Sequence, residues 1–168
     1  MDIECSRTFL PKQKLILETD KRFPFYSGGF GAGKTLLGCH KVIKECLENP
    51  GSVWLCASQT YPQLRDTVLV TFMQEVNLLQ KKFDDSNAYI NLIKDFNKTE
   101  LKLVFYNDST VLFRSCDDYS KFKSLSISGF FVDEPADISI DVPILRRIPF
   151  LGGSPQYPQD DRKQNKYI

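Results

Sequence analysis

The apolar positions of this chain fall into short segments whose periods predict different elements. Val53–Ser58 is a continuous apolar run between polar residues, which is typical of a buried strand. Ile127–Val132 is a second such run, and two acidic residues follow it directly. A helix is predicted to start at Pro62, because apolar residues then recur at the spacing of one helix face. These are Leu64, Val68, Phe72, Val76 and Leu79.

Two further strands are predicted in the second half of the chain. Leu101–Tyr106 and Thr110–Ser115 are β-rich runs separated by the turn residues Asn107-Asp108-Ser109. This arrangement predicts a β-hairpin that adds antiparallel strands to the sheet. Residues 81–98 are polar with scattered apolar positions, and they predict no regular element.

A glycine-rich segment lies between a predicted strand, Phe23–Ser27, and a predicted helix that runs from Leu36 to Leu47 and stops at Asn49-Pro50-Gly51. The segment matches the phosphate-binding pattern G-x-x-x-x-G-K-S/T. In such a loop, backbone N–H groups surround a phosphate chain, Lys34 reaches the β- and γ-phosphates, and the Thr35 hydroxyl holds Mg²⁺. The motif therefore predicts ATP as substrate, Mg²⁺ as its ion, and an ATP-binding set. This set is Gly28, Gly29, Gly31, Ala32, Gly33, Lys34, Thr35 and Leu36.

The acidic pair after the second apolar run supplies the other half of the predicted site. Asp133 and Glu134 stand at the carboxyl end of a predicted strand, where ligands bind in open α/β sheets. We expect Asp133 to hold Mg²⁺ through water and Glu134 to polarise the attacking water, a contribution typically worth about 10²–10⁴-fold. The alternative is that the pair simply begins a surface loop.

Two other polar residues leave alternatives open. Gln13 precedes the first predicted strand, and its amide carries both a donor and an acceptor, which suits the edge of adenine. An exposed, helix-capping glutamine is the alternative. Arg65, near the start of the predicted 62–80 helix, either faces the phosphates or pairs with an acid.

Bulk composition narrows the class of protein. The 168 residues suffice for one domain, and 42% hydrophobic with 26% charged residues is ordinary for a soluble globular protein. A net charge of +1 indicates no whole-surface attraction to nucleic acid. No apolar stretch approaches the roughly 20 residues of a membrane helix, and the acidic N-terminus lacks a secretory apolar core. Five cysteines without a C-x-x-C pair indicate neither a disulfide framework nor zinc, and favour a reducing compartment.

The predicted domain covers residues 1–149, with residues 1–22 as an entry segment on the adenine side. Residues 137–145 predict a helix, and composition then shifts to Pro, Gly, Gln and charge. Residues 150–168 are accordingly predicted to be a loosely ordered tail.

Taken in this order, the motifs resemble the ATPase domain of the terminase large subunit of tailed bacteriophages. Four blocks carry the likeness, which covers roughly residues 7–145: Pro11-Lys12-Gln13, Gly28 to Thr35, Ala57 to Thr67, and Phe105 to Pro135. The phosphate loop (Walker A) and the strand-end acid (Walker B) are generic to many NTPases. The order of the blocks between them is what points to terminases.

The resemblance implies an α/β, RecA-like P-loop NTPase of the additional-strand, catalytic-glutamate type, with a mainly parallel sheet flanked by helices. It implies that Lys34 and Glu134 are catalytic, and that a homo-oligomeric ring on the capsid portal packages double-stranded DNA in the host cytoplasm with the terminase small subunit. A cation from a neighbouring subunit would stabilise the transferred phosphoryl group, an effect worth about 10³–10⁵-fold. The candidates are Lys121, Lys123, Arg146 and Arg147.

The chain also departs from that family's pattern. Phe30 stands where many members carry a basic residue, and the coupling motif after Walker B is not recognisable. We also expect no nuclease domain within these residues. Nuclease activity is therefore not expected. Two other functions stay open: a catalytically weak nucleotide-binding module for assembly or regulation, and a helicase-like P-loop ATPase.

Overall fold

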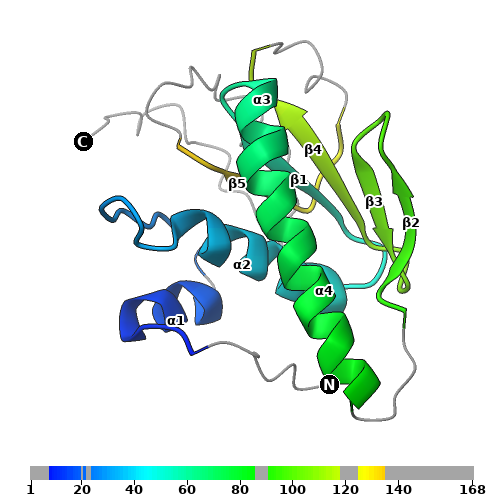
Figure 1. The fold of residues 1–168 in the computed structure, drawn as a ribbon, viewed down its shortest axis with the longest axis horizontal. Coiled ribbons are helices and arrows are strands. Elements are labelled where there is room, and N and C mark those ends of the chain that lie inside the picture. Colours follow the sequence, from blue (N-terminus) through cyan, green and yellow to red (C-terminus); the bar gives the residue numbers. More distant parts are fainter. Residues whose placement is uncertain (1–7, 20, 22–23, 86–90, 118–124, 135–168) are drawn as a thin grey trace, which may run out of the picture.

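The chain forms helices packed against one mixed sheet (Figure 1). The computed structural model describes residues 8–19, 21, 24–85, 91–117 and 125–134, without the side chains of residues 82–85. The elements are α1 (Pro11–Glu18), α2 (Lys34–Glu48), β1 (Val53–Ser58), α3 (Tyr61–Gln63), the π-helical η1 (Leu64–Leu69), α4 (Val70–Asp85), β2 (Ile93–Asn97), β3 (Lys102–Phe105), β4 (Thr110–Ser115) and β5 (Gly129–Val132).

The five described strands are ordered β2-β3-β4-β1-β5. β1 pairs in parallel with both β4 and β5, whereas the pairs β2–β3 and β3–β4 are antiparallel. The predicted hairpin is confirmed, with Leu103 opposite Val111. Its place differs from the prediction, because β4 is the direct parallel neighbour of β1. The described sheet is therefore mixed rather than mainly parallel.

Strand β2 was missed by the sequence interpretation. It pairs with β3 at the edge of the described sheet, and Lys94 and Asp95 within it are exposed. Charged side chains are common on edge strands, because they discourage pairing of the free edge with another chain. Its alternation was too weak to recognise among polar residues.

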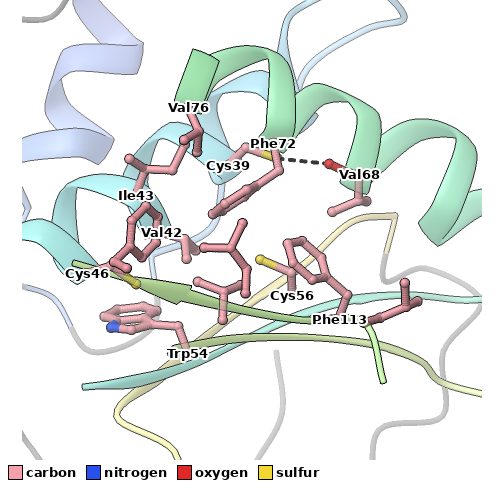
Figure 2. Close-up of a cluster of buried hydrophobic side chains, with 14 of the residues drawn as sticks. Cys39, Val42, Ile43, Cys46, Trp54, Cys56, Val68, Phe72, Val76 and Phe113 are labelled. Atoms are coloured by element: carbon pink, nitrogen blue, oxygen red, sulfur yellow. Dashed lines mark hydrogen bonds between the residues drawn. The ribbon is translucent and has the colours of Figure 1, made fainter. Parts of the chain in front are cut away.

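The main core lies between one face of the sheet and the helices α2, η1 and α4 (Figure 2). The predicted helical stripe is confirmed, since each of its five members is at most 2% exposed. Phe72 packs against the rings of Phe105 and Phe113, with centroids 6.4 and 5.1 Å apart. The Cys39 thiol donates to the Val68 carbonyl of the π-helical turn at 3.7 Å. Apolar contacts thus hold the helices on the sheet, and the thiol hydrogen bond joins α2 to η1.

Strand β5 contributes to both faces of the sheet. Phe130 and Val132 pack with the cluster of Leu55, Ala57, Leu112 and Ile127 on one face. Phe131 packs against the main core on the helical face. Because side chains alternate along a strand, the residue two positions after Phe131, which is Asp133, also faces α2.

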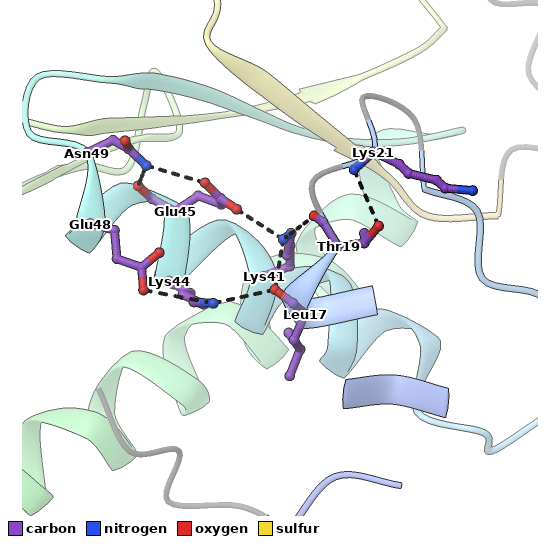
Figure 3. Close-up of polar contacts among 8 residues, drawn as sticks. All are labelled: Leu17, Thr19, Lys21, Lys41, Lys44, Glu45, Glu48 and Asn49. Carbon is purple, nitrogen blue, oxygen red and sulfur yellow. Dashed lines mark hydrogen bonds and ion pairs between the residues drawn. The ribbon is translucent and has the colours of Figure 1, made fainter. Parts of the chain in front are cut away.

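Helix α1 is attached to α2 through lysine side chains (Figure 3). Lys41 donates to the carbonyl oxygens of Leu17 and Thr19 at 2.8 and 3.4 Å, and Lys44 donates to Leu17 at 3.4 Å. Cations at a helix C-terminus satisfy carbonyl groups that have no partner within the helix. Lys41 also pairs with Glu45 at 3.0 Å. These bonds fix the position of α1, and with it Gln13, beside α2.

The prediction of a strand at Phe23–Ser27 is wrong for residues 24–27, which are the part of this segment that the structure describes. Residues 24–27 form no strand, and the Phe25 side chain is 75% exposed. A strand needs a ladder partner, and β5 pairs only with β1 among the strands described. Residues 22 and 23, the helix predicted at 137–145 and the tail predicted at 150–168 lie outside the described residues. No helix in the described part of the chain has the length and apolar character to cross a membrane.

Candidate functional site

The glycine-rich loop leads directly into the N-terminus of α2. Gly31 and Gly33 have φ values of +75° and +71°, a left-handed backbone conformation that residues other than glycine rarely adopt. Gly33 is the N-cap, and its carbonyl accepts the N–H of Leu37 at 2.9 Å. The loop is closed by a bond from the Ala32 N–H to the Gly29 carbonyl at 3.2 Å. Backbone N–H groups at the start of a helix attract anions, so this local structure suits a phosphate group, as the motif predicts.

Lys34 spans this loop from the first position of α2. Its Nζ donates to the carbonyl oxygens of Gly28 and Gly29, at 3.1 and 3.2 Å. These two hydrogen bonds hold the ammonium group at the loop. A compact cation in this place suits a phosphate chain.

Thr35 and Asp133 meet, as the two motifs predict. The Thr35 hydroxyl donates to Asp133 Oδ2 at 2.9 Å, although the two residues are 98 positions apart in the sequence. The Asp133 N–H donates to the Ala57 carbonyl at 2.9 Å, so the acid stands directly at the end of β5. Asp133 is only 7% exposed, and burial raises the pKa of its carboxyl, while the Thr35 hydroxyl lowers it, the Glu134 charge raises it and the Lys34 charge lowers it.

Glu134 follows at a turn of the backbone. Its φ is +52°, a left-handed conformation that is uncommon for a residue other than glycine. Its side chain is exposed, in contrast to that of Asp133. The alternative that this pair is only the start of a surface loop does not describe Asp133, which is buried against α2. The activation of water by Glu134 stays a prediction.

The donor set at Thr35 and Asp133 fits Mg²⁺. Both groups offer oxygen ligands, which a hard cation prefers. Within the described ranges, no cluster of three or more His, Cys, Asp and Glu residues would hold a metal by itself. Mg²⁺ is commonly bound through one or two protein oxygens, substrate phosphates and waters rather than by a complete protein cage. The described residues match that mode.

Gln13 lies against the loop. It is 7% exposed, its Oε1 accepts the N–H of Leu10 at 2.9 Å, and its Nε2 donates to the Ala32 carbonyl at 3.1 Å. It does cap a helix, as one alternative held, but it is buried rather than exposed. Its contact with adenine stays a prediction.

The predicted cation contacts are placed only in part. Arg65 Nε and Nη2 donate to Asp66 Oδ1 and Oδ2 at 2.6 and 3.0 Å, and both side chains are 57% exposed. Of the two alternatives for Arg65, the structure shows the pairing with an acid, and this pairing raises the Arg65 pKa and lowers the pKa of Asp66. Lys121, Lys123, Arg146 and Arg147 lie outside the described residues.

A buried polar pair behind the loop was missed. His40 of α2 and Glu75 of α4 are 2% and 1% exposed, and His40 Nδ1 lies 3.3 Å from Glu75 Oε2. The ring of Phe9 packs on the imidazole with centroids 4.9 Å apart. The sequence carried a partial signal for the burial of Glu75, because this residue directly precedes Val76 of the buried stripe. Nothing in the sequence connected Glu75 with His40.

The fold and the site define an α/β protein in which a glycine-rich loop at a helix N-terminus faces an acid at a strand end. The chain belongs to the terminase large-subunit family: residues 25–142 match the family model described as terminase large subunit, T4likevirus-type, N-terminal.

Two phage proteins of known structure have a similar fold. The large terminase ATPase domain of Thermus phage P74-26 aligns with a TM-score of 0.55 and 19% identity, over 70% of this chain and 52% of that one. The large terminase of a second, thermophilic bacteriophage aligns with a TM-score of 0.52 and 18% identity, over 77% of this chain and 32% of that one. This chain thus spans about half or less of each neighbour. No curated protein sequence gave a match.

Proposed function

We propose that this chain is the Mg²⁺-dependent ATP-hydrolysing domain of a phage terminase large subunit, with a RecA-like fold. The observation that carries the proposal is the 2.9 Å bond between Thr35 and Asp133, which brings the two motifs together. The family match over residues 25–142 supports the assignment to terminases over a helicase-like ATPase.

In this proposal, the described residues divide the work of phosphoryl transfer. The loop amides from Gly29 to Gly33, the N-terminus of α2 and Lys34 hold the phosphates. Thr35 and Asp133 would hold Mg²⁺, which would neutralise the negative charge that develops during phosphoryl transfer. Glu134 orients the attacking water and takes its proton.

Steady-state phosphate release tests the assignment. Lys34→Ala and Glu134→Ala are each expected to lower the rate by at least about 10²-fold. Glu134→Ala should retain ATP binding, whereas Lys34→Ala should weaken it, because only Lys34 of the two contacts phosphate. Lys94→Ala is the matched control, since Lys94 pairs with Asp108 on the exposed surface. Unchanged rates in both site variants would falsify the site assignment.

The biological role follows from the family and is likewise proposed. Hydrolysis would power the packaging of double-stranded DNA into procapsids, by a homo-oligomeric ring on the capsid portal with the terminase small subunit, in the cytoplasm of the bacterial host. The measurement is stimulation of ATP turnover by portal and DNA together. Turnover that these partners leave unchanged would contradict the motor role while leaving the ATPase assignment intact.

One observation favours a second candidate, a catalytically weak nucleotide-binding module. Phe30, at the tip of the loop, is fully exposed in the position where many terminases carry a basic residue. Without that charge, less of the transition state is stabilised within one subunit. ATP binding with Mg²⁺ but no turnover, even at high protein concentration with portal and DNA, would establish this candidate.

A further inference from the structure

Helix α2 and strand β5 approach each other most closely at a glycine. Gly38 lies one helical turn after Thr35, and Phe131 lies two residues before Asp133 on the same face of β5. A Cβ atom added to Gly38 would lie 2.1 Å from Cε2 of the Phe131 ring, and 2.4 Å from both Cδ2 and Cζ. The ring therefore occupies the volume that any other side chain would need.

The clash is large compared with the tolerance of the site. Carbon atoms pack at about 3.5 Å or more, so the 2.1 Å contact falls short by about 1.4 Å. An added methyl group must displace the ring or separate α2 from β5 by a distance of that order. The bond between Thr35 and Asp133 is 2.9 Å long, and a hydrogen bond of this kind is lost beyond about 3.5 Å. A separation of α2 and β5 by that distance would therefore break the bond between Thr35 and Asp133.

The Phe131 side chain is partly buried, and its packing limits how far the ring can move on the side that faces the core. Phe131 packs against the main core, and its neighbour on β1 is the fully buried Cys56. Two residues earlier, Gly129 is covered by the Trp54 ring, which an added Cβ would meet at 2.3 Å. Along the helix-facing side of β5, the Trp54 ring covers Gly129, and the ring of Phe131 then packs against Gly38. Asp133 follows on the same side.

Gly38 also opposes local helix stability. Glycine inside a helix costs about 0.5–1 kcal/mol relative to alanine, and Gly38 is in the first half of the 15-residue α2. Its φ is not in the left-handed region, so no backbone requirement explains it. The contact with Phe131 does.

We propose that Gly38 is a positioning residue, which sets the separation of α2 and β5 so that Thr35 and Asp133 serve one Mg²⁺. The inference rests on the proposed function. Phosphate binding and Mg²⁺ binding would then depend on different parts of the site. The loop amides and Lys34 contact phosphate without β5, whereas Mg²⁺ needs both α2 and the end of β5.

The experiment measures ATP affinity with Mg²⁺ and with EDTA, for the wild type, Gly38→Ala, Phe131→Val and the double variant. Gly38→Ala should lower the Mg²⁺ enhancement of affinity at least tenfold and leave affinity in EDTA within about twofold. Valine lacks all three contacting ring atoms, so Gly38→Ala combined with Phe131→Val should recover most of the enhancement. Glu48→Ala, at the far end of α2, is the control.

The outcomes separate the inference from the function. A wild type without Mg²⁺ enhancement contradicts the proposed function. If Mg²⁺ enhances ATP affinity equally in the wild type and in Gly38→Ala, the positioning role is overturned. A folded Gly38→Ala variant that loses affinity equally with Mg²⁺ and with EDTA also overturns it. If Gly38→Ala does not fold, the double variant decides: folding with the enhancement regained supports the role, and failure to regain it overturns the role.

Discussion

The Thr35 hydroxyl donates to Asp133 Oδ2 at 2.9 Å, although the two residues are 98 positions apart in the chain. The first stands in the opening turn of α2 and the second directly follows β5. Because both side chains carry oxygen atoms and Asp133 is buried, the pair forms a small polar site at an otherwise apolar helix–strand contact.

This pair predicts a distinct pattern of metal dependence. Thr35→Ser keeps the hydroxyl and is expected to retain Mg²⁺-dependent turnover, whereas Thr35→Ala and Asp133→Asn each remove one oxygen ligand and should lower it by at least about 10²-fold. Titration of turnover against free Mg²⁺ measures this. Equal Mg²⁺ dependence in all three variants would show that the ion is held elsewhere.

Gln13 predicts a difference between ATP and a phosphate chain without a base. Because its Nε2 bonds to the Ala32 carbonyl of the loop at 3.1 Å, Gln13→Ala should weaken the binding of Mg²⁺-tripolyphosphate as well as that of ATP. Isothermal titration calorimetry with both ligands measures this. If only ATP binding weakens, Gln13 acts on the adenine, which is one of the two alternatives that the sequence left open.

The buried pair of His40 and Glu75 predicts a large effect on stability. His40→Ala removes a partner of Glu75 inside the core, and the loss of one member of a buried pair typically costs about 3–5 kcal/mol. Lys94→Ala breaks a pair whose side chains are 58% and 70% exposed, so it should cost less than about 1 kcal/mol. Urea unfolding of both variants compares them, and equal stability losses would contradict the structural role of the pair.

The cysteines predict a sharp contrast in thiol reactivity. Burial raises the pKa of the Cys39, Cys46 and Cys56 thiols, and at Cys39 the charge of Asp133 adds to this. Fewer thiolates at a given pH mean slower reaction. With Cys5 replaced by serine, Ellman's reagent at pH 8 should label Cys116 first, because Cys116 is only half-buried, and the other three only on unfolding. Rapid native labelling of all four would contradict the core packing.

Much of the site was predictable because its signals are local. The glycines of the loop, the apolar stripe from Leu64 to Leu79 and the hairpin around Asn107 each depend on a few neighbouring residues, whose backbone preferences and periods determine the element. Other features depend on what packs beside them. The segment at Phe23–Ser27 has the composition of a strand but no ladder partner in the described sheet, and β2 forms as an edge strand beside β3 although its sequence is mostly polar.

The amino-acid sequence by itself determined the chemistry of this protein: a loop with the φ values that glycine permits, a lysine and a threonine at a helix start, and an acid after an apolar strand. Only the tertiary structure decided which groups meet. It placed Gln13 on the loop, Arg65 on Asp66 and His40 beside Glu75, and it set the distance from Thr35 to Asp133 through Gly38 and Phe131. The physical reason is that side-chain type and local period are properties of neighbouring residues, whereas contact across a core depends on the close packing of elements far apart in the chain.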